Sequence, residues 1–134
     1  MKANELMIGD WVRCGQRFAI IKELYNGYVT ILCSINGQNE YVEETYDNID
    51  PIPLTLEILK KNKLNILNIN INNSYTNILG YFDEDENNLL EIYIEEDEIW
   101  WSISYAEYTI LRLRYVHELQ HALKLCGIKK EIEL

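Results

Sequence analysis

The chain has 134 residues, of which 48% are hydrophobic and 25% are charged, and its formal net charge is −10. This length fits one domain or two small packed units, and the hydrophobic fraction is sufficient for a folded core. No apolar run approaches the roughly 18 residues that a membrane-spanning helix needs. The start at Met1 does not lead into the apolar region of an export signal. These features argue against membrane-spanning helices and predict a cytoplasmic protein.

The three cysteines, Cys14, Cys33 and Cys126, are odd in number and lie far apart in the sequence. No pair of them has the Cys-x-x-Cys spacing of a zinc or redox site. They predict reduced, structural thiols, as expected in the cytoplasm.

The negative charge is concentrated in one stretch of the chain. Residues 81–108 contain ten acidic side chains and no lysine or arginine. Because phosphate contacts need clustered basic residues, this stretch predicts no direct nucleic-acid binding. Two interpretations stay open: acidic turns that keep a β-rich protein soluble, or a surface that binds a basic partner by mimicking nucleic-acid charge.

The N-terminal part, residues 1–50, contains short apolar segments separated by turns. Asn26-Gly27 and Asn36-Gly37 are strong hairpin signals, because both residue types tolerate positive φ. Five short strands at this spacing predict an SH3-like small β-barrel or meander.

A joint follows at Pro51 and Pro53, which no helix crosses, because proline restricts the residue before it to extended conformations. Thr55 is then positioned to cap a short helix from Leu56 to about Lys61. Asn62 or Lys63 is expected to end this helix.

The remaining chain, residues 51–134, combines this helix with strands and a second helix. Alternation predicts strands within 62–77 and near 76–82, 89–95, 98–104 and 109–114. A helix is predicted from Tyr115 to Cys126, with Gly127 as its C-terminal cap. Residues 128–134 alternate apolar and charged side chains and predict a final edge strand. The fold class is therefore α+β, with a C-terminal helix packed on an antiparallel sheet through Val116, Leu119 and Leu123, against residues such as Ile92, Ile99 and Ile103.

Aromatic and acidic residues of this sheet form a candidate binding surface. In the strand near 98–104, Trp100 falls on the face opposite Ile99, Trp101 and Ile103. Tyrosine and tryptophan are favoured at interfaces, although aromatic residues that alternate on a strand are also common in cores. The candidate surface residues are Tyr93, Trp100, Tyr105, Glu91 and Glu95.

Both histidines of the chain lie in the sequence His117-Glu118-Leu119-Gln120-His121, which has the H-E-x-x-H pattern of zinc hydrolases. On a helix, His117 and His121 share a face and can bind one zinc ion, while Glu118 acts as the general base on a zinc-bound water.

Two features of the sequence argue against this zinc site. A catalytic zinc needs a third protein ligand, and the sequence does not indicate which acidic residue would provide it. The pattern also predicts an apolar helix stripe for the core and a solvated stripe opposite it, which consists of His117, Gln120, His121 and Lys124.

Three tracts of the chain are similar to a family of known sequences. They are the opening Lys2 to Val12, the joint Ile49 to Asn62, and the ending at Arg114 to Gln120 and 128–134. These tracts resemble a group of small uncharacterised proteins of gut Bacteroides-type bacteria and their phages. The resemblance implies no known activity. It does imply that the histidine pair is not essential, because members of that group commonly carry Asn where this chain has His121.

The sequence therefore predicts a binding protein, rather than an enzyme, without a cofactor. We expect an accessory protein of a phage or mobile element that counters host defence by binding a protein or a small signal molecule. The alternatives are the zinc-dependent hydrolase and the acidic nucleic-acid mimic. No membrane partner is expected, and a homo-oligomer would form through an edge strand at 99–104 or 128–134.

Overall fold

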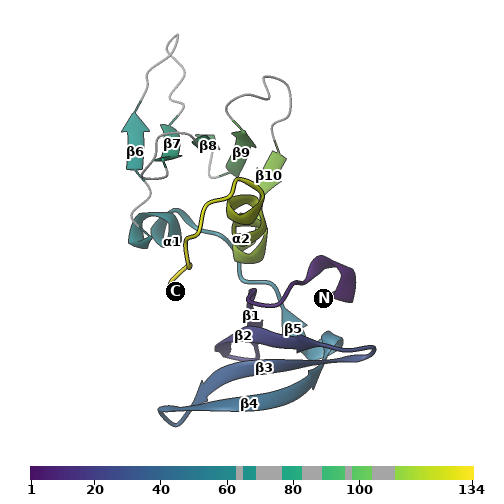
Figure 1. Ribbon diagram of the computed structural model, residues 1–134. Coiled ribbons are helices and arrows are strands. Elements are labelled where there is room, and N and C mark those ends of the chain that lie inside the picture. The colour runs from purple at the N-terminus through teal and green to yellow at the C-terminus, as the bar shows by residue number, and fades with distance from the viewer. Residues whose placement is uncertain (63–64, 69–76, 83–88, 96–97, 104–110) are drawn as a thin grey trace. The chain divides into compact units, whose positions relative to one another are not determined.

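The structure is a computed structural model that describes residues 1–62, 65–68, 77–82, 89–95, 98–103 and 111–134 (Figure 1). It divides into two compact units. The N-terminal unit comprises Met1–Pro53 with Tyr115–His117, and the second unit comprises Leu54–Arg114 with Glu118–Leu134. Each contains a five-stranded antiparallel sheet in the described part, so the fold is α+β as predicted.

The sheet of the N-terminal unit is a meander of successive hairpins. Its strands have the order β4-β3-β2-β1-β5. The 3-10 turn η1 (Ala3–Glu5) precedes the sheet, and η2 (Tyr46–Asn48) lies between β4 and β5. The strands are β1 (Trp11–Cys14), β2 (Arg17–Leu24), β3 (Tyr28–Ile35), β4 (Gln38–Thr45) and β5 (Ile49–Asp50).

Both predicted Asn-Gly hairpins are present. Asn36 and Gly37 have φ values of 52° and 79°, as a two-residue turn between β3 and β4 requires. At the other turn, Gly27 has φ 94°, and the Tyr25 N–H donates to the Tyr28 carbonyl at 2.9 Å. These turns fix the register, and the register determines which side chains face the core.

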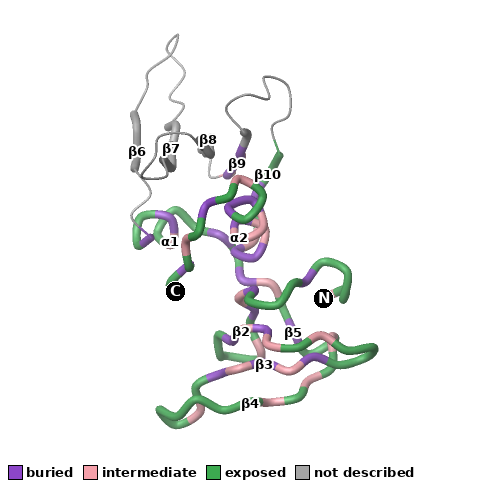
Figure 2. The backbone as a smooth tube through the Cα atoms, in the orientation of Figure 1, coloured by how far each residue is buried: buried purple, intermediate pink, exposed green. Residues whose placement is uncertain are grey.

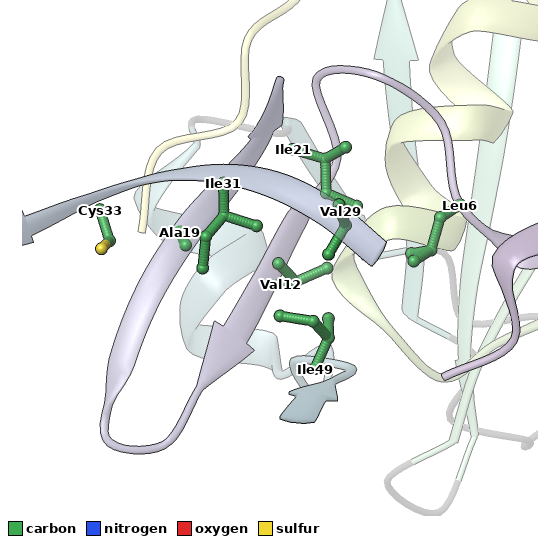
Figure 3. Close-up of a cluster of buried hydrophobic side chains, with 8 residues drawn as sticks. All are labelled: Leu6, Val12, Ala19, Ile21, Val29, Ile31, Cys33 and Ile49. Atoms are coloured by element: carbon green, nitrogen blue, oxygen red, sulfur yellow. The ribbon is translucent and has the colours of Figure 1, made fainter. Parts of the chain in front are cut away.

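One face of this sheet carries the core of the unit. Because side chains alternate along a strand, Val12, Ile21 and Ile31 fall on the same face and are fully buried. Figure 3 shows the eight clustered side chains, which are Leu6, Val12, Ala19, Ile21, Val29, Ile31, Cys33 and Ile49. Each buried large side chain stabilises the fold by about 1.5–3 kcal/mol.

The meander is confirmed, whereas a closed barrel is not. Among the described residues, β4 and β5 lie at opposite ends of the sheet and do not pair with each other. The ladder between β2 and β3 has one irregularity, where the register shifts between Ile21 and Glu23. Such a bulge bends the sheet, and it returns Leu24 to the core face.

The second unit begins with the short helix α1 (Leu56–Lys61), which has the predicted bounds. The Thr55 hydroxyl oxygen accepts the Ile58 N–H at 3.3 Å, and the helix ends at Asn62. The sheet of this unit has the order β10-β9-β8-β7-β6. Its strands are β6 (Asn65–Asn68), β7 (Asn77–Phe82), β8 (Leu89–Glu95), β9 (Glu98–Ile103) and β10 (Leu111–Leu113). Because β9 pairs with both β8 and β10, the prediction that 99–104 is an edge strand was wrong.

The last helix, α2 (Val116–Leu125), lies within one residue of its predicted bounds. Gly127 has φ 71° and donates to the Lys124 carbonyl at 3.1 Å, while the Ile128 N–H donates to the Leu123 carbonyl at 2.9 Å. This pair of bonds is a Schellman cap, which confirms Gly127 as the predicted stop. Leu119 and Leu123 are buried as predicted, whereas the packing of α2 on Ile92 and Ile103 involves side chains outside the described ones.

The predicted final strand at 128–134 is absent. Instead, the Asn62 side chain donates to the Glu133 carbonyl at 2.9 Å and accepts the Glu133 N–H at 2.8 Å. One amide side chain thus satisfies the backbone groups that a neighbouring strand would have paired. Ile128 and Ile132 are buried. In the described part of the chain, no helix is long and apolar enough to cross a membrane.

Candidate functional site

The histidine motif lies in the first turns of α2, where the structure corrects one prediction. His117 was expected on a solvated face, but it is only 4% exposed. Residues 115–117 group with the N-terminal unit, where Val116 donates to the Ile52 carbonyl at 2.9 Å. The His117 ring stacks on Tyr115, with centroids 5.7 Å apart and 9° between the planes.

The Glu118 carboxylate closes the start of α2. Its Oε2 atom accepts the backbone N–H of Arg114 at 2.6 Å, four residues back in the chain. This contact resembles a capping box, in which an acidic side chain of the first turn satisfies a backbone donor at the helix start. A general base directs its carboxylate toward a metal-bound water, whereas here one of the two carboxylate oxygens of Glu118 is engaged at the helix start.

The other histidine, His121, is half-buried. The Nδ1 atom of His117 is buried and makes no hydrogen bond, although the residue takes part in other interactions. Within the described residues, no group of three or more His, Cys, Asp or Glu side chains is arranged to hold a metal ion. The structure therefore shows two helical histidines without identifying the third ligand that the hydrolase hypothesis requires.

The predicted aromatic surface is only partly described. The register places Tyr93 of β8 directly opposite Trp100 of β9, and Trp100 opposite Arg112 of β10. Trp100 is half-buried, and Ile99 and Trp101 are buried, as their alternation predicted. Tyr105 and the side chains of Tyr93, Glu91 and Glu95 lie outside the description.

Most of the acidic stretch also lies outside the described residues. At its described margin, Glu95 pairs in register with Glu98, and Arg112 forms a salt bridge to Glu98 at 3.1 Å. The acidic mimic therefore stays a prediction. The salt bridge shows that the Glu98 carboxylate is paired with Arg112, a basic residue that lies outside the acidic stretch 81–108.

A row of apolar side chains that the sequence prediction missed crosses the N-terminal sheet. The register pairs Trp11 with Ile20, Ile20 with Leu32, and Leu32 with Tyr41, from β1 to β4. These residues alternate with the buried core residues, so they lie on the opposite face. Tyr41 is 70% exposed, whereas the other three are half-buried.

The same face carries a second exposed aromatic residue, Phe18, which is 50% exposed and lies next to Ile20 on one side of β2. We refer to Phe18, Ile20, Leu32 and Tyr41 as the outer apolar face. The uninterrupted apolar runs at residues 19–21 and 31–33 could have revealed it, because a strand with one solvated face usually alternates.

The exposed Tyr25 and Tyr28 and the half-buried Tyr46 of this unit have contacts within the fold. Tyr25 and Tyr28 stack with centroids 4.5 Å apart, and the Tyr25 hydroxyl donates to the Glu23 carboxylate. The Tyr46 hydroxyl donates to the Tyr25 carbonyl at 2.7 Å. These residues therefore stabilise the turn between β2 and β3 and account for three of the tyrosines without a binding role.

The cysteines are free thiols, as predicted. Burial raises the pKa of both Cys14 and Cys126, and the nearby Glu44 carboxylate raises that of Cys14 further. A raised pKa leaves a thiol protonated at neutral pH and therefore poorly nucleophilic. These residues are consistent with structural roles.

Comparisons with protein-family models, with curated proteins and with solved structures find no match for this chain. The functional assignment therefore depends on the chemistry of the residues described above. Of these, the outer apolar face carries two exposed aromatic side chains, Phe18 and Tyr41, on one face of the sheet.

Proposed function

We propose that this chain is a non-enzymatic binding protein that holds a protein partner on the outer apolar face. The observation that carries the proposal is Tyr41, a tyrosine 70% exposed at the end of an apolar row that crosses four strands. Contiguous exposed apolar side chains on a folded domain are typical of interaction sites. Tyrosine is also enriched among the residues that contribute most to binding.

A protein partner fits this surface better than a small signal molecule. The side chains of the outer apolar face lie side by side on a sheet, with Phe18 and Tyr41 exposed, and neighbouring strands lie about 4.8 Å apart. Such a row offers a large partner several contacts, whereas small ligands are usually enclosed in a concave site. The half-buried Leu32 beside Tyr41 supplies the apolar centre that protein interfaces favour.

The hydrolase alternative has weaker support. Glu118 accepts a backbone N–H at 2.6 Å, and His117 is buried against Tyr115. The contact of Glu118 accounts for this residue at the start of α2 without a metal ion, and the stacking of His117 on Tyr115 likewise needs none. The outer apolar face has no comparable explanation.

Two finer expectations complete the proposal. The pairing of the first strand with the last, β1 with β5, supports an open form of an SH3-like barrel for the N-terminal unit. The resemblance of the three tracts motivates the setting, which is an accessory protein of a phage or mobile element that counters host defence.

Site-specific cross-linking in the native host tests this proposal. A p-benzoylphenylalanine residue replaces either Tyr41 or Leu125, which are matched in exposure at 70% and 74% but lie on different elements. We expect a discrete protein adduct from position 41 and none from position 125. Leu32→Ser, placed beside position 41, is expected to reduce the adduct about tenfold, as for a residue at an interface centre. No adduct at position 41, or identical adducts from both positions, would contradict the proposal.

A further inference from the structure

The strand β4 is one end of the N-terminal sheet, and in the part of the chain that the structure describes it pairs with β3 alone. Figure 2 shows that most of this strand is exposed. An edge strand of eight residues presents backbone N–H and C=O groups that another strand can pair with. We infer that β4 binds an extended segment of the partner protein, which adds to the sheet as a sixth strand. This inference rests on the proposed function, because it specifies the segment that docks beside the outer apolar face.

The backbone geometry of β4 identifies the groups that would pair. The two-residue turn at Asn36-Gly37 closes on the pair Ile35–Gln38. In such a hairpin the closing pair is hydrogen-bonded, and bonded and non-bonded pairs then alternate along the ladder. The N–H and C=O groups of Asn39, Tyr41 and Glu43 therefore point away from β3, toward the free edge.

The side chains of β4 specify the chemistry of the bound segment. The strand carries three glutamates, Glu40, Glu43 and Glu44, and no lysine or arginine. Tyr41 and Val42 lie between them. In antiparallel pairing, side chains directly opposite each other interact, so acidic residues favour basic partners and apolar residues favour apolar partners. From its N-terminus, the bound segment therefore has the order basic, basic, apolar, apolar, basic, opposite residues 44 to 40.

A second copy of this chain is a poorer occupant than a basic segment. Pairing β4 with β4 would bring six glutamates into one two-stranded ribbon with no basic residue. Like charges on adjacent strands are destabilising, and acidic side chains on an edge strand protect against self-association.

Two synthetic peptides of equal composition and charge test the order of residues. Both have threonine flanks; the matched peptide has the core Lys-Lys-Val-Val-Lys, and the scrambled peptide has Val-Lys-Lys-Lys-Val. We expect the full chain to bind the matched peptide about tenfold more tightly by fluorescence anisotropy, since several opposed pairs are lost in the scrambled one. Equal affinity for the two peptides would overturn the inference.

Amide exchange measured by NMR tests the pairing itself. With the matched peptide bound, exchange is expected to slow at Asn39, Tyr41 and Glu43, while Glu40 and Val42, already bonded to β3, change little. Protection that does not alternate along β4 would overturn strand addition, because contact through side chains alone does not distinguish neighbouring amides.

A matched pair of variants separates backbone pairing from charge. Glu43→Pro removes an outward N–H without breaking a bond to β3, and Glu43→Gln removes the same charge but keeps the N–H. The proline variant is expected to bind the matched peptide about tenfold more weakly than the glutamine variant. Equal affinity of the two variants for the matched peptide would overturn the inference. So would a dimer of the chain alone that the Glu43→Pro substitution abolishes. If position 41 gives a protein adduct but the chain binds the matched and scrambled peptides equally, this inference is wrong and the proposed function still holds.

Discussion

The Tyr25 hydroxyl is exposed, yet its hydrogen bond to the Glu23 carboxylate raises the pKa of Tyr25 to about 12 from an ordinary value of 10.0. A raised pKa means that the folded state favours the neutral phenol. The contribution of this bond to stability is therefore fully present below pH 10.0 and is lost as the pH rises through about 12. At neutral pH, the turn between β2 and β3 keeps this contact intact.

A titration of the tyrosines tests this interaction at the residue scale. With tyrosine labelled at the ring carbon that bears the hydroxyl, NMR is expected to show the Tyr25 signal titrating at about 12. Glu23→Gln removes the acceptor charge, so the midpoint should fall toward 10.0. The same midpoint in both proteins would show that the carboxylate does not hold the phenol in solution.

At the scale of elements, the Glu118 carboxylate contributes to the start of α2 through the 2.6 Å contact with the Arg114 N–H. Glu118→Ala removes this acceptor and is expected to lower the free energy of unfolding by about 1 kcal/mol in urea. Glu118→Gln retains a side-chain oxygen and should lose less. If Glu118→Ala unfolds like the wild type, the carboxylate has no structural role, and its assignment as a catalytic base gains support.

The elements that the sequence predicted well are those with local signals. Thr55 caps α1, Gly127 ends α2, and Asn36-Gly37 turns β3 into β4, each because a particular side chain or positive φ is needed at that position. The final strand was predicted wrongly from the alternation of its side chains. The backbone groups of Glu133 are bonded by the side chain of Asn62, 71 residues away, and not by a neighbouring strand. Such a contact leaves no periodic signal in the sequence.

The candidate sites show the same division between local and distant information. Alternation correctly separated Trp100 from the buried Ile99 and Trp101. The burial of His117 was not predicted, because the apolar periodicity of the helix places this residue opposite the buried stripe that includes Leu119 and Leu123. The outer apolar face depends on the register of four strands, which only the pairing reveals.

At the scale of the whole molecule, a zinc titration of the full chain decides between binding protein and hydrolase. Calorimetry of untagged protein at neutral pH is expected to show no stoichiometric zinc and no difference between wild type and His121→Asn. The reason is that His117 is buried and stacked on Tyr115, and no third ligand accompanies the two histidines among the described residues. One equivalent of tightly bound zinc, lost in His121→Asn, would restore the hydrolase and its requirement for a third ligand.

The most direct measurement for the binding function is the affinity of the cross-linked partner for two purified variants, Tyr41→Ser and Leu125→Ser. Both remove one large exposed side chain of matched exposure, 70% and 74%, but only Tyr41 lies on the outer apolar face. By calorimetry, Tyr41→Ser is expected to weaken binding by about 30-fold, as for a tyrosine that contributes strongly to an interface, and Leu125→Ser by less than about twofold. Equal affinities for both variants would contradict the account and place the binding surface elsewhere on the chain.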